Sequence, residues 1–285
     1  MIDVPGSLAP RLRRAVTLAL PVLLIGCAGP RDAPPALLQS AARQTRAGQE
    51  VYLHGNAAAA VPALGEAVRL HLAAGDLPGA TLALVNLALA QRAAGDAPGA
   101  ASSAARLRDL APAARQQARE RAGKDETPAA EIAAASAWLA ALLALDRGDA
   151  PTAAVLLAGV RPKLPARSPW PGRTETLRAE IALANGDVPG AIACARIGQV
   201  ASAAARDHTE EARAWRLAGA AHLRLGHWKE ARVAFLAAVK IEETLGSGDR
   251  MAGDLSQLAA ISEKLGDPGA AQLYTERARA IVAAR

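Results

Sequence analysis

Aromatic residues and cysteines are scarce in this chain. Its 285 residues include four Trp, two Tyr, one Phe and two Cys. Two cysteines, Cys27 and Cys194, exclude a framework of several disulfides. Alanine dominates instead, and alanine has the best helix propensity and a poor strand propensity. The composition therefore predicts an all-α protein whose helices pack closely through small side chains.

Motifs for catalysis are also absent. The sequence contains no G-x-S-x-G, P-loop, HExxH or GxGxxG pattern. Two of its five histidines, His222 and His227, stand five residues apart, with no neighbouring cysteine or carboxylate pair to complete a metal site. We therefore expect no enzymatic activity, no metal and no cofactor.

The net charge of +6 comes from 33 basic and 27 acidic residues. The arginines are scattered among Asp and Glu rather than gathered on one element, which is typical of a solvated basic surface. A nucleic-acid-binding protein usually concentrates its basic residues, so we expect no nucleic-acid partner.

The N-terminal residues have the pattern of an export signal. Arg11, Arg13 and Arg14 precede an apolar run over residues 15–25. This run is about half the roughly 20 residues that a membrane-spanning helix needs, which favours a cleaved signal peptide over residues 1–26.

The segment Leu24-Ile25-Gly26-Cys27 resembles the lipobox of bacterial lipoproteins. That resemblance implies cleavage between Gly26 and Cys27 and attachment of fatty acyl chains to Cys27, with Leu24, Ile25 and Gly26 as the signal-peptidase recognition residues. It also implies outer-membrane sorting, because Ala28 rather than Asp follows the cysteine. Residues 27–35 then form the acylated cysteine and a tether rich in Pro and Gly. The alternative is an ordinary secretory signal in which the cysteine occurs by chance.

An internal repeat organises the rest of the chain. The string Gly-Asp-x-Pro-Gly-Ala occurs at residues 75–80, 95–100 and 186–191, and variants of it begin at Gly148, Gly226 and Gly266. Each copy suits a helix–helix corner: a glycine ends one helix, an aspartate caps the next, and a proline occupies its first turn. Gly186, Gly226 and Gly266 are 40 residues apart, and two antiparallel helices in such a period indicate an α-solenoid.

The segment 215–238 resembles the tetratricopeptide repeat (TPR) family, since Trp215, Gly219, Gly226, Ala231, Phe235 and Ala238 stand at the spacing of that motif. The resemblance implies an all-α, TPR-like superhelix of about six antiparallel helix pairs. We predict the pairs at residues 36–74, 78–122, 128–161, 173–203, 208–246 and 249–284, grouped as repeats 36–162 and 173–285. Four prolines between residues 161 and 173 predict a non-helical linker over 163–172, either a hinge or a rigid spacer.

The resemblance also implies that a groove binds partners. Its positions correspond to Arg213, Arg216, Ala220 and Arg224 in the best repeat, and to Arg173, Glu180, Asn86, Arg92, Trp138 and Lys264 in its neighbours. Arg213 and Arg216 lie three residues apart, so they share a helix face and suit an acidic peptide or a terminal carboxylate. The alternatives are solvated arginines and, for Trp138, a place in the core.

We accordingly expect a membrane-anchored scaffold or assembly factor of the bacterial cell envelope, facing the periplasm, that docks envelope proteins or peptides. Two other functions stay open: a passive structural spacer without a specific ligand, and a regulator of a peptidoglycan enzyme.

Overall fold

The computed structural model describes residues 35–120, 127–159 and 164–284, so the predicted signal peptide, its lipobox and Cys27 lie outside the described residues. The described residues form twelve helices and no strand. In chain order the helices are α1 (Ala36–Leu53), α2 (Ala57–Ala73), α3 (Leu77–Ala93), α4 (Ala97–Glu120), α5 (Thr127–Asp146), α6 (Ala150–Ala158), α7 (Trp170–Ala184), α8 (Val188–Ala205), α9 (His208–Arg224), α10 (Trp228–Leu245), α11 (Gly248–Lys264) and α12 (Pro268–Ala283).

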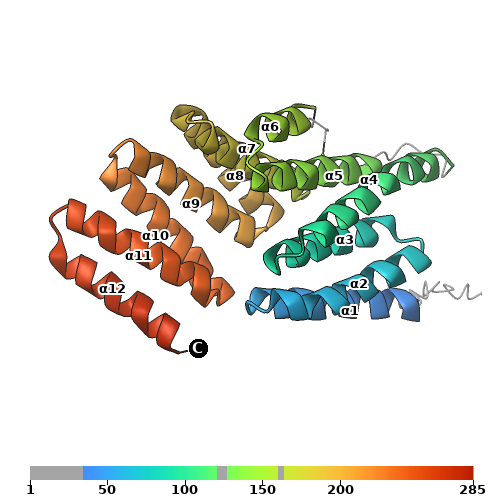
Figure 1. Cartoon of the computed structure of the whole chain (residues 1–285), viewed down its shortest axis with the longest axis horizontal. Coiled ribbons are helices and arrows are strands. Elements are labelled where there is room, and N and C mark those ends of the chain that lie inside the picture. The colour runs from blue at the N-terminus through green and yellow to red at the C-terminus, as the bar shows by residue number, and fades with distance from the viewer. Residues whose placement is uncertain (1–34, 121–126, 160–163, 285) are drawn as a thin grey trace, which may run out of the picture. The chain divides into compact units, whose positions relative to one another are not determined.

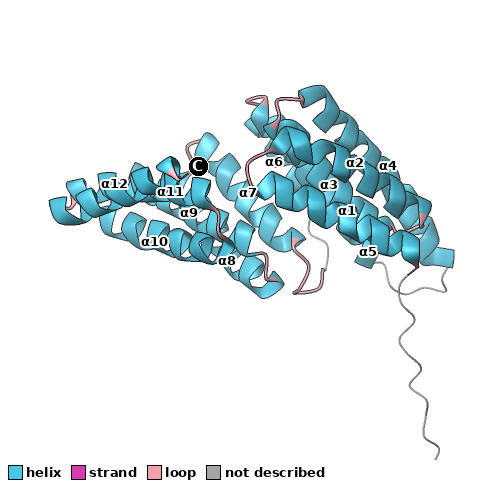
Figure 2. Cartoon of the chain, turned by 90° about the horizontal axis from the view of Figure 1, so that it is seen from below, coloured by secondary structure: helices cyan, strands magenta, loops and turns pink. Residues whose placement is uncertain are grey.

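The helices form six consecutive antiparallel pairs (Figure 1). Each helix packs against the next, and the first helices of successive pairs, from α1 through α3, α5 and α7 to α9, also contact one another in turn. Repeats that touch mainly their neighbours define a solenoid. The predicted all-α solenoid of six helix pairs is therefore confirmed, and the described residues from 35 to 284 belong to one compact unit (Figure 2).

The repeated corner motif has the predicted geometry. Gly75 adopts a φ of +67°, which only glycine tolerates without strain, and ends α2. Asp76 then accepts a hydrogen bond from the backbone N–H of Gly79 at 3.1 Å and caps α3. A Cβ on Gly79 would lie 2.2 Å from the Asp76 carboxylate, and a Cβ on Gly99 or Gly190 would lie 2.0 Å from the corresponding aspartate. The second glycine of the motif thus leaves room for the capping carboxylate.

One boundary prediction is wrong. Residues 170–172 were expected to belong to a non-helical linker, but α7 begins at Trp170. Pro171 lies in the first turn of this helix, where the backbone N–H has no partner within the helix, so a proline there removes no hydrogen bond. The irregular segment among the described residues is therefore limited to residues 164–169.

Helix α5 is the one described helix that is long and apolar enough to cross a membrane by length and composition, with a mean hydropathy of 1.6. However, 56% of that window is buried inside the protein. The helix packs against α3, α4, α6 and α7, and Ile132 and Leu139 on it have almost no exposed surface. Burial in the solenoid core accounts for its apolar character.

Candidate partner-binding face

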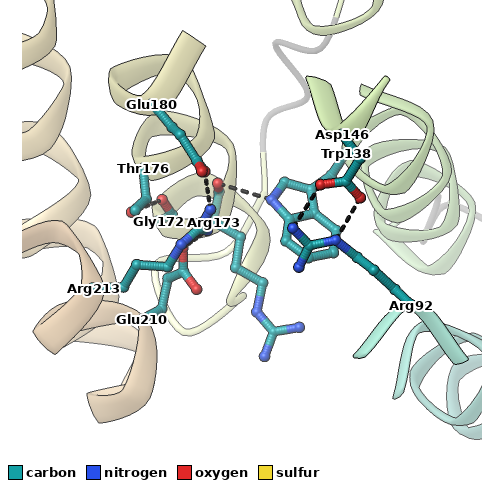
Figure 3. Close-up of polar contacts among 9 residues, drawn as sticks. All are labelled: Arg92, Trp138, Asp146, Gly172, Arg173, Thr176, Glu180, Glu210 and Arg213. Carbon is teal, nitrogen blue, oxygen red and sulfur yellow. Dashed lines mark hydrogen bonds and ion pairs between the residues drawn. The ribbon is translucent and has the colours of Figure 1, made fainter. Parts of the chain in front are cut away.

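The first helices α3, α5, α7 and α9 carry a chain of polar contacts that we call the polar ladder (Figure 3). Its members are Arg92, Trp138, Asp146, Arg173, Glu180, Asp207, Glu210 and Arg213. Five of these residues, Arg92, Trp138, Arg173, Glu180 and Arg213, are predicted groove positions, and they lie on one series of adjoining helices.

At the junction of α3 and α5, Arg92 holds Asp146 through two parallel hydrogen bonds. The Nη2–Oδ1 distance is 2.6 Å and the Nε–Oδ2 distance is 2.5 Å. This forked geometry is the strongest form of an arginine–carboxylate pair, and the hydrogen bonding of Arg92 to the Asp146 carboxylate raises the pKa of Arg92. Beside the pair lies a cavity of about 550 Å³, lined mainly by small side chains such as Ala93 and Ala97 and bordered by Leu143.

At the junction of α5 and α7, Trp138 is 3% exposed, and its Nε1 donates a hydrogen bond to the backbone oxygen of Arg173 at 3.0 Å. The Trp138 and Trp170 ring centroids are 6.1 Å apart. The Arg173 guanidinium lies 5.3 Å from the centre of the Trp170 ring and donates to Asp207 at 2.9 Å. Stacking on Trp170 holds the guanidinium against its own helix, α7, and the ion pair with Asp207 ties it to the beginning of α9 in the next repeat.

At the junction of α7 and α9, Arg213 bonds to Glu180 of α7 and to Glu210 of its own helix. The Arg213 Nη1–Glu210 Oε1 distance is 3.0 Å, and Glu210 is only 8% exposed. Burial lowers the pKa of Arg213, but the charges of Glu210 and Glu180 outweigh it, so the net shift is upward. Arg213 is therefore charged and already has two carboxylate partners.

Comparisons with known proteins identify the fold. Neither a family model nor a curated protein matches the chain. Among solved structures, BtubC (BKLC) from P. vanneervenii is 17% identical and superposes with a TM-score of 0.57, over 87% of this chain and 92% of that one. The fold is a TPR-like α-solenoid. A putative kinesin light chain with nearly identical TPR-like repeats from Podosopora anserina, also 17% identical, covers 87% of this chain and 97% of its own, but its TM-score of 0.37 adds nothing to that identification.

In this TPR-like solenoid the segment that best matches the TPR motif, residues 215–238, lies on α9 and α10. Ala231 and Ala238 are fully buried and Phe235 is 4% exposed. A Cβ on Gly219 would lie 2.7 Å from Phe235 Cε2. The motif residues are therefore explained by the close crossing of the two helices, where a glycine makes room for an aromatic ring.

The remaining predicted arginines also point at parts of the solenoid itself. Arg224 donates to the backbone oxygen of Leu183 on α7. Arg216 bonds to Glu242 of α10 at 2.6 Å and lies 3.2 Å from Asp254 of α11. Arg213 and Arg216 thus reach different elements, and they do not converge on one ligand position in the described structure. A role in partner binding stays a prediction for Arg173, Arg213, Arg216 and Arg224, and Trp138 lies in the core.

The acidic partners of these arginines are not predicted as partners from the sequence, although Glu180 is among the predicted groove positions. Arg213 and Glu180 are 33 residues apart, whereas Arg173 with Asp207 and Arg277 with Glu243 are each 34 apart. Opposite charges 33–34 residues apart, somewhat less than the 40-residue spacing of the corners, are the signal that would have indicated these pairs, because corresponding helices of adjacent repeats adjoin.

Other chemistry-bearing groups are isolated. No cluster of three or more His, Cys, Asp or Glu suited to a metal ion occurs among the residues that the structure describes. The His222 and His227 ring centroids are 5.9 Å apart, and burial lowers the pKa of His222. Burial also raises the pKa of the Cys194 thiol, which makes that cysteine less reactive.

Proposed function

We propose that this protein is a membrane-anchored scaffold of the bacterial cell envelope that docks protein or peptide partners on the face formed by its first helices. The observation that carries the proposal is the adjoining series α3, α5, α7 and α9, which offers a continuous surface along four repeats. Helical solenoids use such extended surfaces for binding.

Features of the face formed by the first helices favour binding of a specific partner over the role of a passive spacer. The cavity between α3, α4 and α5 is large enough for one or two side chains of a partner, and its small lining residues leave it open. Arg92, Asp146 and Arg147 border it with charge of both signs. The contacts of the polar ladder hold α3 and α5, which border the cavity, in fixed positions. Less conformational entropy is then lost when a partner binds.

The anchor is proposed from the sequence. Leu24-Ile25-Gly26-Cys27 supports acylation of Cys27 and cleavage before it, and Ala28 supports outer-membrane sorting. Several acyl chains on one residue give stable attachment, because each buried CH₂ contributes about 0.8 kcal/mol. The folded repeats would then face the periplasm.

Site-specific photo-crosslinking in intact cells tests the docking face. A photoreactive amino acid at Ala93, which lines the cavity, should yield discrete adducts with a partner protein. The matched control is the same residue at Val155, which is 73% exposed on α6 and should yield none. Equal or absent adducts at both positions would favour the passive spacer, and adducts with a peptidoglycan enzyme would favour the regulator.

Metabolic labelling with a fatty acid analogue tests the anchor separately. Label should appear on the wild-type chain and disappear with Cys27→Ser, which should also release the protein from sedimented membranes. A labelled Cys27→Ser variant, or an unlabelled wild type, would contradict acylation at this residue.

A further inference from the structure

Three helices from two repeats meet around one guanidinium near the C-terminal end of the solenoid. Arg216 of α9 donates from Nη2 to Glu242 Oε1 of α10 at 2.6 Å. Its Nε lies 3.2 Å from Asp254 Oδ2 of α11, close enough for an ion pair but without the alignment of a hydrogen bond. Glu242 is 0% exposed and Asp254 is 2% exposed, and we call these two residues the buried carboxylate pair.

Each member of the buried carboxylate pair has one oxygen without a hydrogen-bond donor. Glu242 Oε2 and Asp254 Oδ2 are both buried and have no hydrogen-bond partner. A buried, unsatisfied charged oxygen is costly because it has lost its water without a replacement. One proton on Asp254 would remove one of the two negative charges from this buried pair.

The surrounding charges only partly compensate the pair. Arg250 of α11 approaches Glu242 Oε1 at 3.8 Å. On α12, Arg277 bonds instead to Glu243, which is exposed. Burial, assisted by the charge of Glu242, outweighs the opposing effects of Arg216 and Arg250 and raises the pKa of Asp254 to about 7.

We propose that Asp254 is a proton-binding switch that sets how firmly the last repeat, α11–α12, is docked on α9–α10. The docked repeat holds its proton, and an undocked repeat exposes Asp254 to water and releases it. The last repeat is suited to such a role because, among the described residues, α11–α12 packs on the α9–α10 repeat mainly through α11 and α10, and elements held by fewer contacts open more easily than those packed on several neighbours.

The direction of the pH effect follows from linkage. The ordinary pKa of an aspartate is near 3.8 and that of docked Asp254 is about 7, so the docked form binds more protons between these values. Docking therefore strengthens as the pH falls from about 7 toward 4 and weakens as it rises through 7. For one proton, the opening equilibrium of the repeat should be about tenfold larger at pH 8.5 than at pH 6.

Amide hydrogen exchange of the full-length protein, corrected for intrinsic rates, measures this equilibrium. Peptides from α11 and α12 should lose about tenfold in protection between pH 6 and pH 8.5, relative to peptides from α3. Asp254→Asn mimics the protonated side chain and should make this protection the same at both pH values. The matched control Asp109→Asn, whose side chain is 71% exposed, should behave as the wild type does.

Two results would overturn the proposal. One is wild-type protection of α11 and α12 that changes less than threefold between the two pH values. The other is an Asp254→Asn variant that keeps the full pH dependence. If that variant does not fold its last repeat, Glu242→Gln replaces it: removing the neighbouring charge should shift the midpoint to lower pH, and an unchanged midpoint would count against the proposal.

Discussion

Replacing Arg216 by methionine tests whether this arginine serves the fold. Methionine keeps most of the aliphatic stem and removes the guanidinium, so the change isolates the charge. Glu242, fully buried, would lose its close partner at 2.6 Å. Breaking a buried ion pair by removing one partner costs about 3–5 kcal/mol, since it leaves an uncompensated charge.

The free energy of protonating a carboxylate at a given pH gives a second estimate of the loss of stability in Arg216→Met. An ordinary glutamate needs about 3.7 kcal/mol to take up a proton at pH 7, and about 1 kcal/mol at pH 5. An unpaired buried carboxylate can lose its charge by taking up a proton, so the free energy of protonation limits the loss of unfolding free energy at each pH. We therefore expect Arg216→Met to lower the free energy of unfolding by about 4 kcal/mol at pH 7 and by about 1 kcal/mol at pH 5.

Urea unfolding followed by circular dichroism at 222 nm at both pH values measures the loss. Arg69→Met is the control, because Arg69 and Glu66 form an exposed pair on one helix and such pairs contribute about 0–1 kcal/mol. Arg216→Met combined with Glu242→Leu should recover most of the stability. A loss at pH 7 no larger than that of the control, or one equal at pH 5 and pH 7, would refute the structural role.

Two further predictions concern backbone conformation, and thermal unfolding checks both. Gly75→Ala should destabilise the protein by about 1–2 kcal/mol, because Gly75 has a φ of +67°. Gly65→Ala should stabilise it by up to about 1 kcal/mol, because Gly65 lies inside α2 with nothing within 4 Å of the added Cβ. A melting temperature that moves in the same direction in both variants would contradict this. Arg206 ends α8 with a φ of 59°, a backbone conformation that is strained for arginine but not for glycine. Arg206→Gly should therefore raise the melting temperature by about 1–4 °C. A lower melting temperature would show that the arginine side chain makes a contact that stabilises the protein by more than the backbone strain costs.

The corners and the order of the helices are predictable from the sequence because their causes are local. Gly186, Asp187 and Pro189 act on their own backbone, and their effect does not depend on what packs nearby. The beginning of α7 is not predicted correctly, because a proline usually indicates a break in a helix, whereas Pro171 lies in the first turn, where it removes no hydrogen bond.

The candidate site was predictable only in part. The TPR resemblance gives the helix faces on which Arg213 and Arg216 lie, but not what they contact. Their partners Glu180 and Glu242 lie on other helices, and the choice between a solvated, a paired and a ligand-binding arginine depends on burial. Burial is a property of the assembled repeats, which helix periodicity alone does not supply.

The geometry of the corner motif has an evolutionary consequence. Where Asp76 caps α3, its carboxylate lies in the volume that a side chain at position 79 would need, and a glycine stands there. The corner at Asp149 carries Thr152 at the equivalent position and keeps the cap, with the Thr152 N–H donating to Asp149 at 3.0 Å. Ala270 after Asp267 is a further case. We therefore expect the capping aspartate to be retained when a repeat of this kind is copied or diverges, while the third residue after it varies, because the cap needs only the backbone N–H of that residue.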